Sequence, residues 1–194
     1  MALHRFDIAA LAAAPWKNGG GSTREVLCWP PGSDLDHFDW RVSIATIAKD
    51  GPFSVFAGVD RRIMLLRGAG VQLAGEGVRH HLDTPFEPLT FSGDLALQCA
   101  LLGGESTDFN LMTRRARGRA DLNVWRQAGE WVARHGLLLA LRGRWQVNLS
   151  HGTRTLADGE GLWWADEPLT ARCTPEGAAA RLAAVRWQPI FKAK

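Results

Sequence analysis

Leu66-Arg67-Gly68 leads into Val71-Gln72-Leu73 in the first half of the chain, and Leu141-Arg142-Gly143 leads into Val147-Asn148-Leu149 in the second. Each copy is followed by a glycine-punctuated turn and by a segment with large aromatic side chains. Short apolar segments between Gly, Pro, Asp and Asn clusters are typical of strands, and a repeat of them indicates two similar β modules. The repeat therefore predicts a mainly β protein built from two sandwich or barrel halves.

The predicted modules span residues 1–115 and 120–194, and the basic stretch 114–119 connects them. Helical periodicity is weak, so two alanine-rich stretches, 8–14 and 177–184, are expected to form short helices at most. A chain of 194 residues can bury roughly 70% of its unfolded surface. We expect one compact protein of two modules.

The cysteines indicate where the protein works. Cys28, Cys99 and Cys173 are odd in number and far apart, which favours buried free thiols over a disulfide framework or a zinc knuckle. No apolar run approaches the length of a membrane span. We expect a soluble, cytoplasmic protein with no membrane partner.

Residues 15–25 read Pro-Trp-Lys-Asn-Gly-Gly-Gly-Ser-Thr-Arg-Glu and hold much of the unusual chemistry of the chain. A phosphate loop is disfavoured, because the sequence after the glycines resembles a strand and lacks the Gly-Lys-Ser/Thr ending. The glycines alone fit a wide turn that enters a strand equally well. The polar side chains around them, Lys17, Asn18, Thr23, Arg24 and Glu25, predict a wall of a ligand site.

The segment Phe-Asp-Trp-Arg-Val-Ser-Ile-Ala, residues 38–45, alternates with period two. Trp40, Val42 and Ile44 share a face that must be core, while Arg41 and Ser43 share the other face. The periodicity leaves open whether that polar face meets solvent or lines a concave lumen.

Two further segments are ambiguous between structure and ligand contact. Phe53 is typical of a core residue but could form a ligand platform with Ser54 beside it. Asp108 and Asn110 lie two residues apart, which fits either an Asx-type turn or a pair of ligand contacts.

Several other kinds of site are disfavoured. Four arginines crowd residues 114–119, but no aromatic residues interleave them, so we expect a solvated loop and no nucleic-acid partner. His80 and His81 are adjacent and point to opposite faces of a strand, and no histidine pair has metal-ligand spacing. No serine or cysteine lies in a nucleophile elbow. We expect no metal, no cofactor and no covalent catalysis.

Taken together, the motifs resemble the HutD/Ves family. The resemblance is carried, in family order over residues 15–115, by the glycine-rich block, Phe-x-Trp-Arg-x-Ser-x-Ala, Asp-Gly-Pro-Phe-Ser-x-Phe, Phe-x-Gly-Asp and Asp-Phe-Asn-Leu-Met. It implies a two-module cupin, or bicupin. The His-x-His set of metal-binding cupins is missing from the sequence.

The resemblance also implies a function. HutD proteins are associated with bacterial histidine utilisation, as proteins that bind a pathway intermediate and moderate the pathway, and Ves proteins are linked to environmental stress. Formiminoglutamate, formylglutamate and urocanate all carry carboxylates, which Lys17, Arg24 and Arg41 could pair. Glu25 or Asp108 would receive a polar N–H. The remaining contacts to amide or imino groups would come from Asn18, Thr23, Ser43, Ser54 and Asn110.

We therefore predict a metal-free binding protein for a small carboxylate metabolite. One alternative is a metal-free isomerase or hydrolase with Glu25 as general base and Lys17 as acid or electrostatic stabiliser. Another is a stress-induced protein of the Ves type. The sequence leaves open whether the protein forms a homodimer.

Overall fold

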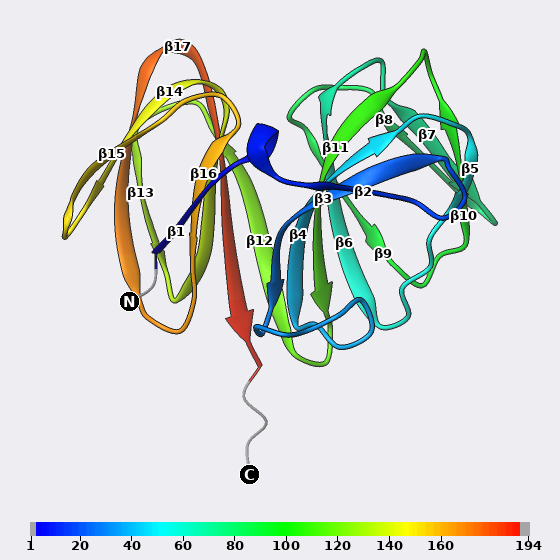
Figure 1. Ribbon diagram of the computed structural model, residues 1–194, viewed down its shortest axis with the longest axis horizontal. Coiled ribbons are helices and arrows are strands. Elements are labelled where there is room, and N and C mark those ends of the chain that lie inside the picture. Colours follow the sequence, from blue (N-terminus) through cyan, green and yellow to red (C-terminus); the bar gives the residue numbers. More distant parts are fainter. Residues whose placement is uncertain (1–2, 191–194) are drawn as a thin grey trace. The chain divides into compact units, whose positions relative to one another are not determined.

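The computed structural model describes residues 3–190, which form strands almost throughout (Figure 1). One compact unit is Leu11–Gly118, and the other joins residues 3–10 to residues 119–190. Strand β1 (Leu3–Asp7) pairs antiparallel with β16 (Glu160–Trp164) in this second unit. The start of the chain thus lies outside the Leu11–Gly118 unit, whereas the sequence placed it in a module spanning 1–115.

Two antiparallel sheets build the Leu11–Gly118 unit, and Figure 1 shows the smaller one to the right of the larger. The larger runs in the order β2-β3-β4-β11-β6-β9 and the smaller in the order β5-β10-β7-β8. The strands of the larger sheet are β2 (Ala13–Pro15), β3 (Gly21–Trp29), β4 (Trp40–Ile47), β11 (Ser106–Arg114), β6 (Val59–Arg67) and β9 (Pro88–Ser92). Those of the smaller are β5 (Gly51–Phe53), β10 (Leu97–Leu101), β7 (Val71–Gly75) and β8 (Val78–Leu82).

The core of this unit lies between its two sheets. Ile63 and Leu65 of β6 pack in one cluster with Leu73 of β7 and Leu97 of β10. These apolar residues recur with period two along their strands, as expected for a sheet that turns one face to the core. The same face of the larger sheet also carries the polar residues of the candidate site.

The other unit forms a single seven-stranded sheet system around its own tryptophan-rich core. Trp145 and Trp164 are fully buried there together with Leu138 and Leu156. Besides β1 and β16, its strands are β12 (Gly118–Trp125), β13 (Gly129–Ala133), β14 (His135–Leu149), β15 (Gly152–Leu156) and β17 (Leu169–Pro189).

The two copies of the sequence repeat differ in structure. The first forms the end of β6, a turn and the start of β7. The second lies entirely within β14, where the register with β17 shifts on both sides of Arg142. Gly143 has φ of 72°, a left-handed conformation that accommodates such an irregularity within a strand. The second copy is therefore a bulge in one long strand and not a turn between two.

Helical content is smaller than the sequence allowed. Of residues 8–14, only Ile8–Ala10 is helical, as a single 3-10 turn, and residues 177–184 belong to strand β17. Ala180, Leu182 and Ala184 alternate into the core of their unit, so burial with period two overrides the helix propensity of the alanines. Residues 177–184 thus stay within the limit that the sequence set, a short helix at most, and form no helix at all. No helix among residues 3–190 is long and apolar enough to cross a membrane.

The core between the two sheets can be tested by truncation. Leu73 has no exposed surface, and Leu73→Ala should lower the free energy of unfolding by about 2 to 5 kcal/mol because it leaves a cavity. Leu102→Ala is the matched control, since Leu102 is 43% exposed and its loss should cost less than about 0.5 kcal/mol. Urea denaturation of both variants gives the comparison, and equal losses would contradict the assigned core.

Candidate ligand-binding site

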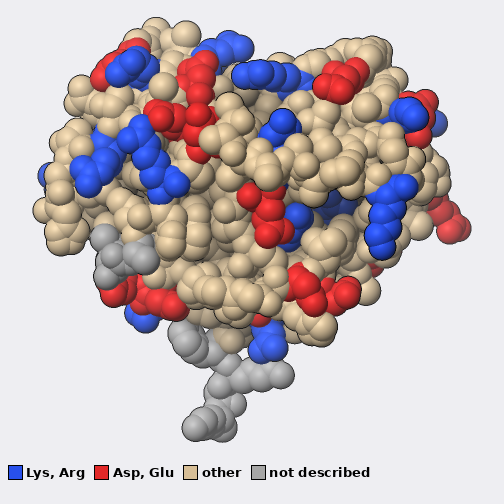
Figure 2. Space-filling view, in the orientation of Figure 1, with Lys and Arg blue, Asp and Glu red and all other residues tan. Residues whose placement is uncertain are grey.

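A cavity of about 750 Å³ opens into the Leu11–Gly118 unit. In Figure 2, blue lysine or arginine atoms are visible at the bottom of a hollow in this unit. The lining includes every residue proposed from the sequence except Arg24, and it adds Trp16, Phe56, Arg61 and Met112 among others. The residues that the sequence proposed and that line the cavity are Lys17, Asn18, Thr23, Glu25, Arg41, Ser43, Phe53, Ser54, Asp108 and Asn110.

The strand register explains why these side chains converge. Ser43 of β4 lies opposite Glu25 of β3 on one side and opposite Asn110 of β11 on the other. Asp108 lies opposite Ala45 one pleat further along. Directly opposed residues project from the same face of a sheet, so the three strands present one polar surface to the cavity. Asp108 and Asn110 lie within a strand, and the Asx-turn interpretation was wrong.

Arg24 does not belong to this surface. It lies between Thr23 and Glu25 on β3 and opposite Ile44 of β4, which places it on the face turned away from the cavity. Arg24 therefore lies outside the cavity in which it was expected to pair with a ligand carboxylate.

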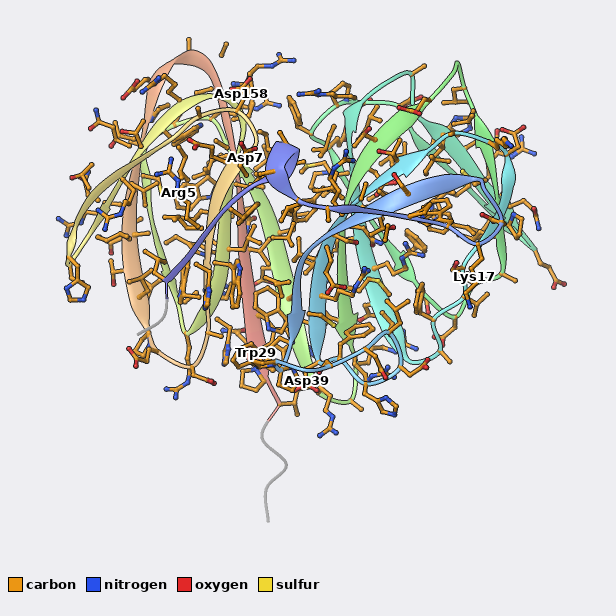
Figure 3. All side chains as sticks on the ribbon, viewed as in Figure 1. Arg5, Asp7, Lys17, Trp29, Asp39 and Asp158 are labelled. Atoms are coloured by element: carbon orange, nitrogen blue, oxygen red, sulfur yellow. The ribbon has the colours of Figure 1, made fainter. Side chains whose placement is uncertain are left out.

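The glycine-rich turn has a structural explanation. A Cβ atom on Gly21 would lie 2.1 Å from the carbonyl oxygen of Thr46 and 3.0 Å from the ring of Trp16, so only glycine fits there. The Asn18 side chain accepts a hydrogen bond of 2.9 Å from the amide of Gly20. The turn carries Lys17, labelled in Figure 3, to the lining of the cavity.

Arg41 is held by neighbours on the same surface. Its Nε donates to Glu25 Oε2 at 2.8 Å and its Nη1 donates to Ser43 Oγ at 3.1 Å. Arg41 is only 7% exposed, so the polar face of β4 lines a lumen and does not meet bulk solvent. The carboxylate of Glu25 is engaged by this ion pair, which makes Glu25 a poor general base.

Arg61 is the main functional residue that sequence reasoning missed. It projects from β6 and is 4% exposed. Its Nε donates to Asn110 Oδ1 at 3.4 Å, its Nη1 donates to the carbonyl oxygen of Ser54 at 3.3 Å, and its guanidinium lies 4.3 Å from the centre of the Phe53 ring. Burial lowers the pKa of Arg61 to about 10, which leaves the side chain charged at neutral pH.

A signal for Arg61 exists in the sequence, because Val59, Arg61 and Ile63 share one face of a strand. Asp60 and Arg62 on either side give the segment the character of a solvated charged run, and that pattern hides the buried arginine.

Asp108 is the least satisfied polar group of the cavity. Its side chain is buried, and neither carboxylate oxygen accepts a hydrogen bond from any residue between 3 and 190. Burial raises the pKa of Asp108 to about 7, and the charge of Arg61 opposes this rise only in part. Both oxygens are closed off from solvent, so Asp108 adds a buried carboxyl to the wall of the cavity.

The basic stretch after β11 is engaged in internal contacts. Arg115 pairs with Asp60 at 2.8 Å and also with Asp94, and Arg117 pairs with Asp39 at 3.4 Å. Arg114 donates to the carbonyl oxygens of residues 36 and 38. These arginines make their contacts within their own unit.

No group of three His, Cys, Asp or Glu side chains within the described part of the chain is arranged to hold a metal ion. The charged groups that line the cavity are three cations, Lys17, Arg41 and Arg61, and two carboxylates, Glu25 and Asp108. Such a lining suits a small ligand that carries both negative charge and hydrogen-bond donors.

A sequence model of the HutD family matches residues 8–182. The chain belongs to the HutD family. Protein Ves from Cronobacter sakazakii is 40% identical over 169 residues, which are 86% of this chain and 90% of the relative. HutD from Pseudomonas fluorescens SBW25, whose structure was solved in a formate condition, is 29% identical in sequence to this chain. The two structures superpose with a TM-score of 0.84 over 98% of this chain and all of the other.

Likeness in fold extends further. A cupin 2 conserved barrel domain protein from Leptotrichia buccalis has a TM-score of 0.62 at 9% identity, over 94% of this chain and 95% of the other. The cupin-like, nearly all-β architecture expected from the sequence is confirmed, and so is the resemblance to HutD and Ves.

The pKa of Asp108 makes stability depend on pH. Below about pH 4 both the folded and the unfolded chain hold the proton, so the group has no effect. As the pH rises toward 7 the unfolded chain ionises first, and the folded state loses stability relative to it. The loss is complete above the folded-state pKa of about 7.

We therefore expect Asp108→Asn to be more stable than the unchanged protein at pH 8, by up to about 4 kcal/mol. The gain should shrink to roughly a third of that at pH 5, because that pH lies only about one unit above the pKa of the unfolded aspartate, so ionisation favours the unfolded chain much less. Urea denaturation at the two pH values measures the difference. Asp158→Asn, at an exposed position, should show no such trend, and a gain independent of pH would contradict the assignment.

Proposed function

We propose that the Leu11–Gly118 unit binds a small carboxylate intermediate of histidine degradation and that the protein moderates that pathway in the cytoplasm. Formiminoglutamate, formylglutamate and urocanate are the candidate ligands, in line with the HutD family to which the chain belongs. Three free cysteines suit a reducing compartment. We also propose that both units are cupin modules.

The observation that carries this proposal is the pair of buried arginines in one cavity. Arg41 and Arg61 are 7% and 4% exposed, and both line the same space. A buried guanidinium is costly unless a partner compensates its charge. Glu25 compensates Arg41, whereas Arg61 donates hydrogen bonds only to an amide oxygen and a carbonyl oxygen among residues 3–190, beside aromatic rings and within reach of the charge of Asp108.

A carboxylate ligand would complete the surroundings of Arg61. Its planar guanidinium can donate two parallel hydrogen bonds to one carboxylate, a geometry that a lysine does not reproduce. Three cations against two carboxylates leave the lining with excess positive charge, and partial protonation of Asp108 increases that excess. Phe53 and Trp16 supply apolar surface for the rest of a small ligand.

Two matched substitutions test the charge anchor. Arg61→Lys keeps the charge but removes the bidentate geometry, and it should weaken N-formyl-L-glutamate binding on the order of tenfold or more. Arg24→Lys is the same change on the opposite face of the sheet and should leave the affinity unaltered. Isothermal titration calorimetry measures both. Equal weakening by the two variants would refute the cavity as the binding site.

A thermal-shift screen of the three candidate ligands tests the proposal more broadly. A ligand at ~100 times its dissociation constant should stabilise the protein by about 2.7 kcal/mol. If none of the three raises the melting temperature and calorimetry detects no heat, the ligand assignment fails.

One observation favours a second candidate function, catalysis on a small carboxylate metabolite. A buried carboxyl with a pKa of about 7 is suited to proton transfer, so Asp108 would take the role that the sequence suggested for Glu25. Mass spectrometry of each candidate ligand after long incubation separates the two functions. Recovery of the unchanged compound supports binding alone.

A further inference from the structure

Arg41 and Arg61 lie in one row across the larger sheet, with a single residue between them. Met112 of β11 lies opposite Arg41 of β4 on one side and opposite Arg61 of β6 on the other. Neighbouring strands lie about 4.8 Å apart, so the backbones of the two arginines are roughly 10 Å apart. Directly opposed residues project from the same face of a sheet, and both arginines line the same cavity. Two cations thus enter one space from either side of β11.

Each guanidinium keeps one nitrogen available for a ligand. Every hydrogen bond that Arg41 donates to residues 3–190 uses its Nε or Nη1 atom, and the same holds for Arg61. Neither Nη2 atom has a partner among these residues, and neither is closed off from solvent as the two oxygens of Asp108 are. The Nη end of a guanidinium is a fork that matches the two oxygens of a carboxylate. Each arginine can therefore hold a carboxylate of its own.

The charges of the two arginines also repel each other. Burial lowers the pKa of Arg61 to about 10, the charge of Asp108 opposes this, and the charge of Arg41 adds to the lowering. Glu25 accepts from the Nε side of Arg41 only, and its own side chain is half exposed. Lys17, the third cation of the lining, is exposed and stays hydrated without a ligand. A ligand with two carboxylates can pair with both buried arginines, whereas a ligand with one cannot give each its own.

We infer that the cavity selects dicarboxylates, with one ligand carboxylate on Arg41 and the other on Arg61. The inference rests on the proposed function and narrows its ligand class. Formiminoglutamate and formylglutamate each carry two carboxylates joined by a short carbon chain, whereas urocanate carries one. The two glutamate derivatives are therefore the expected ligands, and urocanate should bind more weakly than either.

Two compounds of the same shape test the need for a second carboxylate. N-formyl-L-glutamine replaces the side-chain carboxylate of N-formyl-L-glutamate with a neutral amide and keeps the other carboxylate. Isothermal titration calorimetry should give the unchanged protein a preference for N-formyl-L-glutamate of roughly ten- to hundredfold, as expected for hydrogen bonds to a charged group. Equal affinities for the two compounds, or binding of urocanate alone, would overturn the inference and leave the proposed function standing. Binding of no candidate ligand would refute the proposed function itself.

Substitution of each arginine then locates the two carboxylates. Arg41→Gln and Arg61→Gln each remove one cation and keep a polar side chain. One variant should lose the preference, to about threefold or less, because it lacks the partner of the side-chain carboxylate. The other should bind both compounds more weakly and retain the preference. Loss in both variants, or retention in both, would contradict one carboxylate on each arginine and overturn the inference.

Arg24→Gln is the matched control, since Arg24 lies on the face of β3 turned away from the cavity. It should change neither the affinity nor the preference. Urea denaturation shows whether each variant is folded. Where the loss of Arg41 or Arg61 prevents folding, the lysine variant takes its place, because lysine keeps the charge and lacks the fork geometry. The preference should then fall in one lysine variant only, by a smaller factor.

Discussion

The register between β4 and β11 is the constraint on which the candidate site depends. This strand pair is buried on both faces: Val42, Ile44, Phe109 and Leu111 are at most 1% exposed on one, while the other carries the polar residues of the cavity. Because side chains alternate with period two, a slip of one residue would exchange the two faces of a strand. Phe109 and Leu111 would then fill the cavity and Asp108 would leave it. The apolar face thus fixes the position of every polar group on the reverse side.

The cavity keeps charged groups where simple packing would place apolar ones. Arg61 continues the row of β6 that Ile63 and Leu65 extend into the core, and Asp108 lies opposite Ala45. Both groups are removed from water: Arg61 donates long hydrogen bonds to Asn110 and Ser54, and none of the residues 3–190 donates a hydrogen bond to Asp108. Local departures of this kind from an otherwise consistent fold are expected at functional sites. The rest of the unit, with its apolar core between two sheets, provides the stability that permits them.

Much of this arrangement could be predicted from the sequence, and the failures have physical causes. The alternation from Trp40 to Ala45 identified a strand with one core face, and the motifs identified most of the cavity lining. Arg24 was misplaced because neighbours on a strand project to opposite sides, so it could not share a wall with Thr23 and Glu25. Arg61 was missed because charged neighbours disguised a buried position. The two copies of the repeat differ in structure because a glycine within a bulge and a glycine within a turn give the same local sequence signal.

The recessed position of the arginines has a consequence for the speed of ligand capture. Because protein has a lower dielectric constant than water, the field of a charge inside the cavity leaves mainly through the cavity opening. This focusing raises the rate at which oppositely charged ligands arrive. The arginines at the end of β11 contribute little to such a field, because aspartates beside Arg115 and Arg117 neutralise them. Added salt should therefore slow association with a carboxylate ligand and leave its dissociation nearly unchanged. The reason is that salt screens the attraction while the ligand is still in solution outside the cavity. The geometry that isolates Arg61 from water also concentrates its attraction for anions at the opening of the cavity.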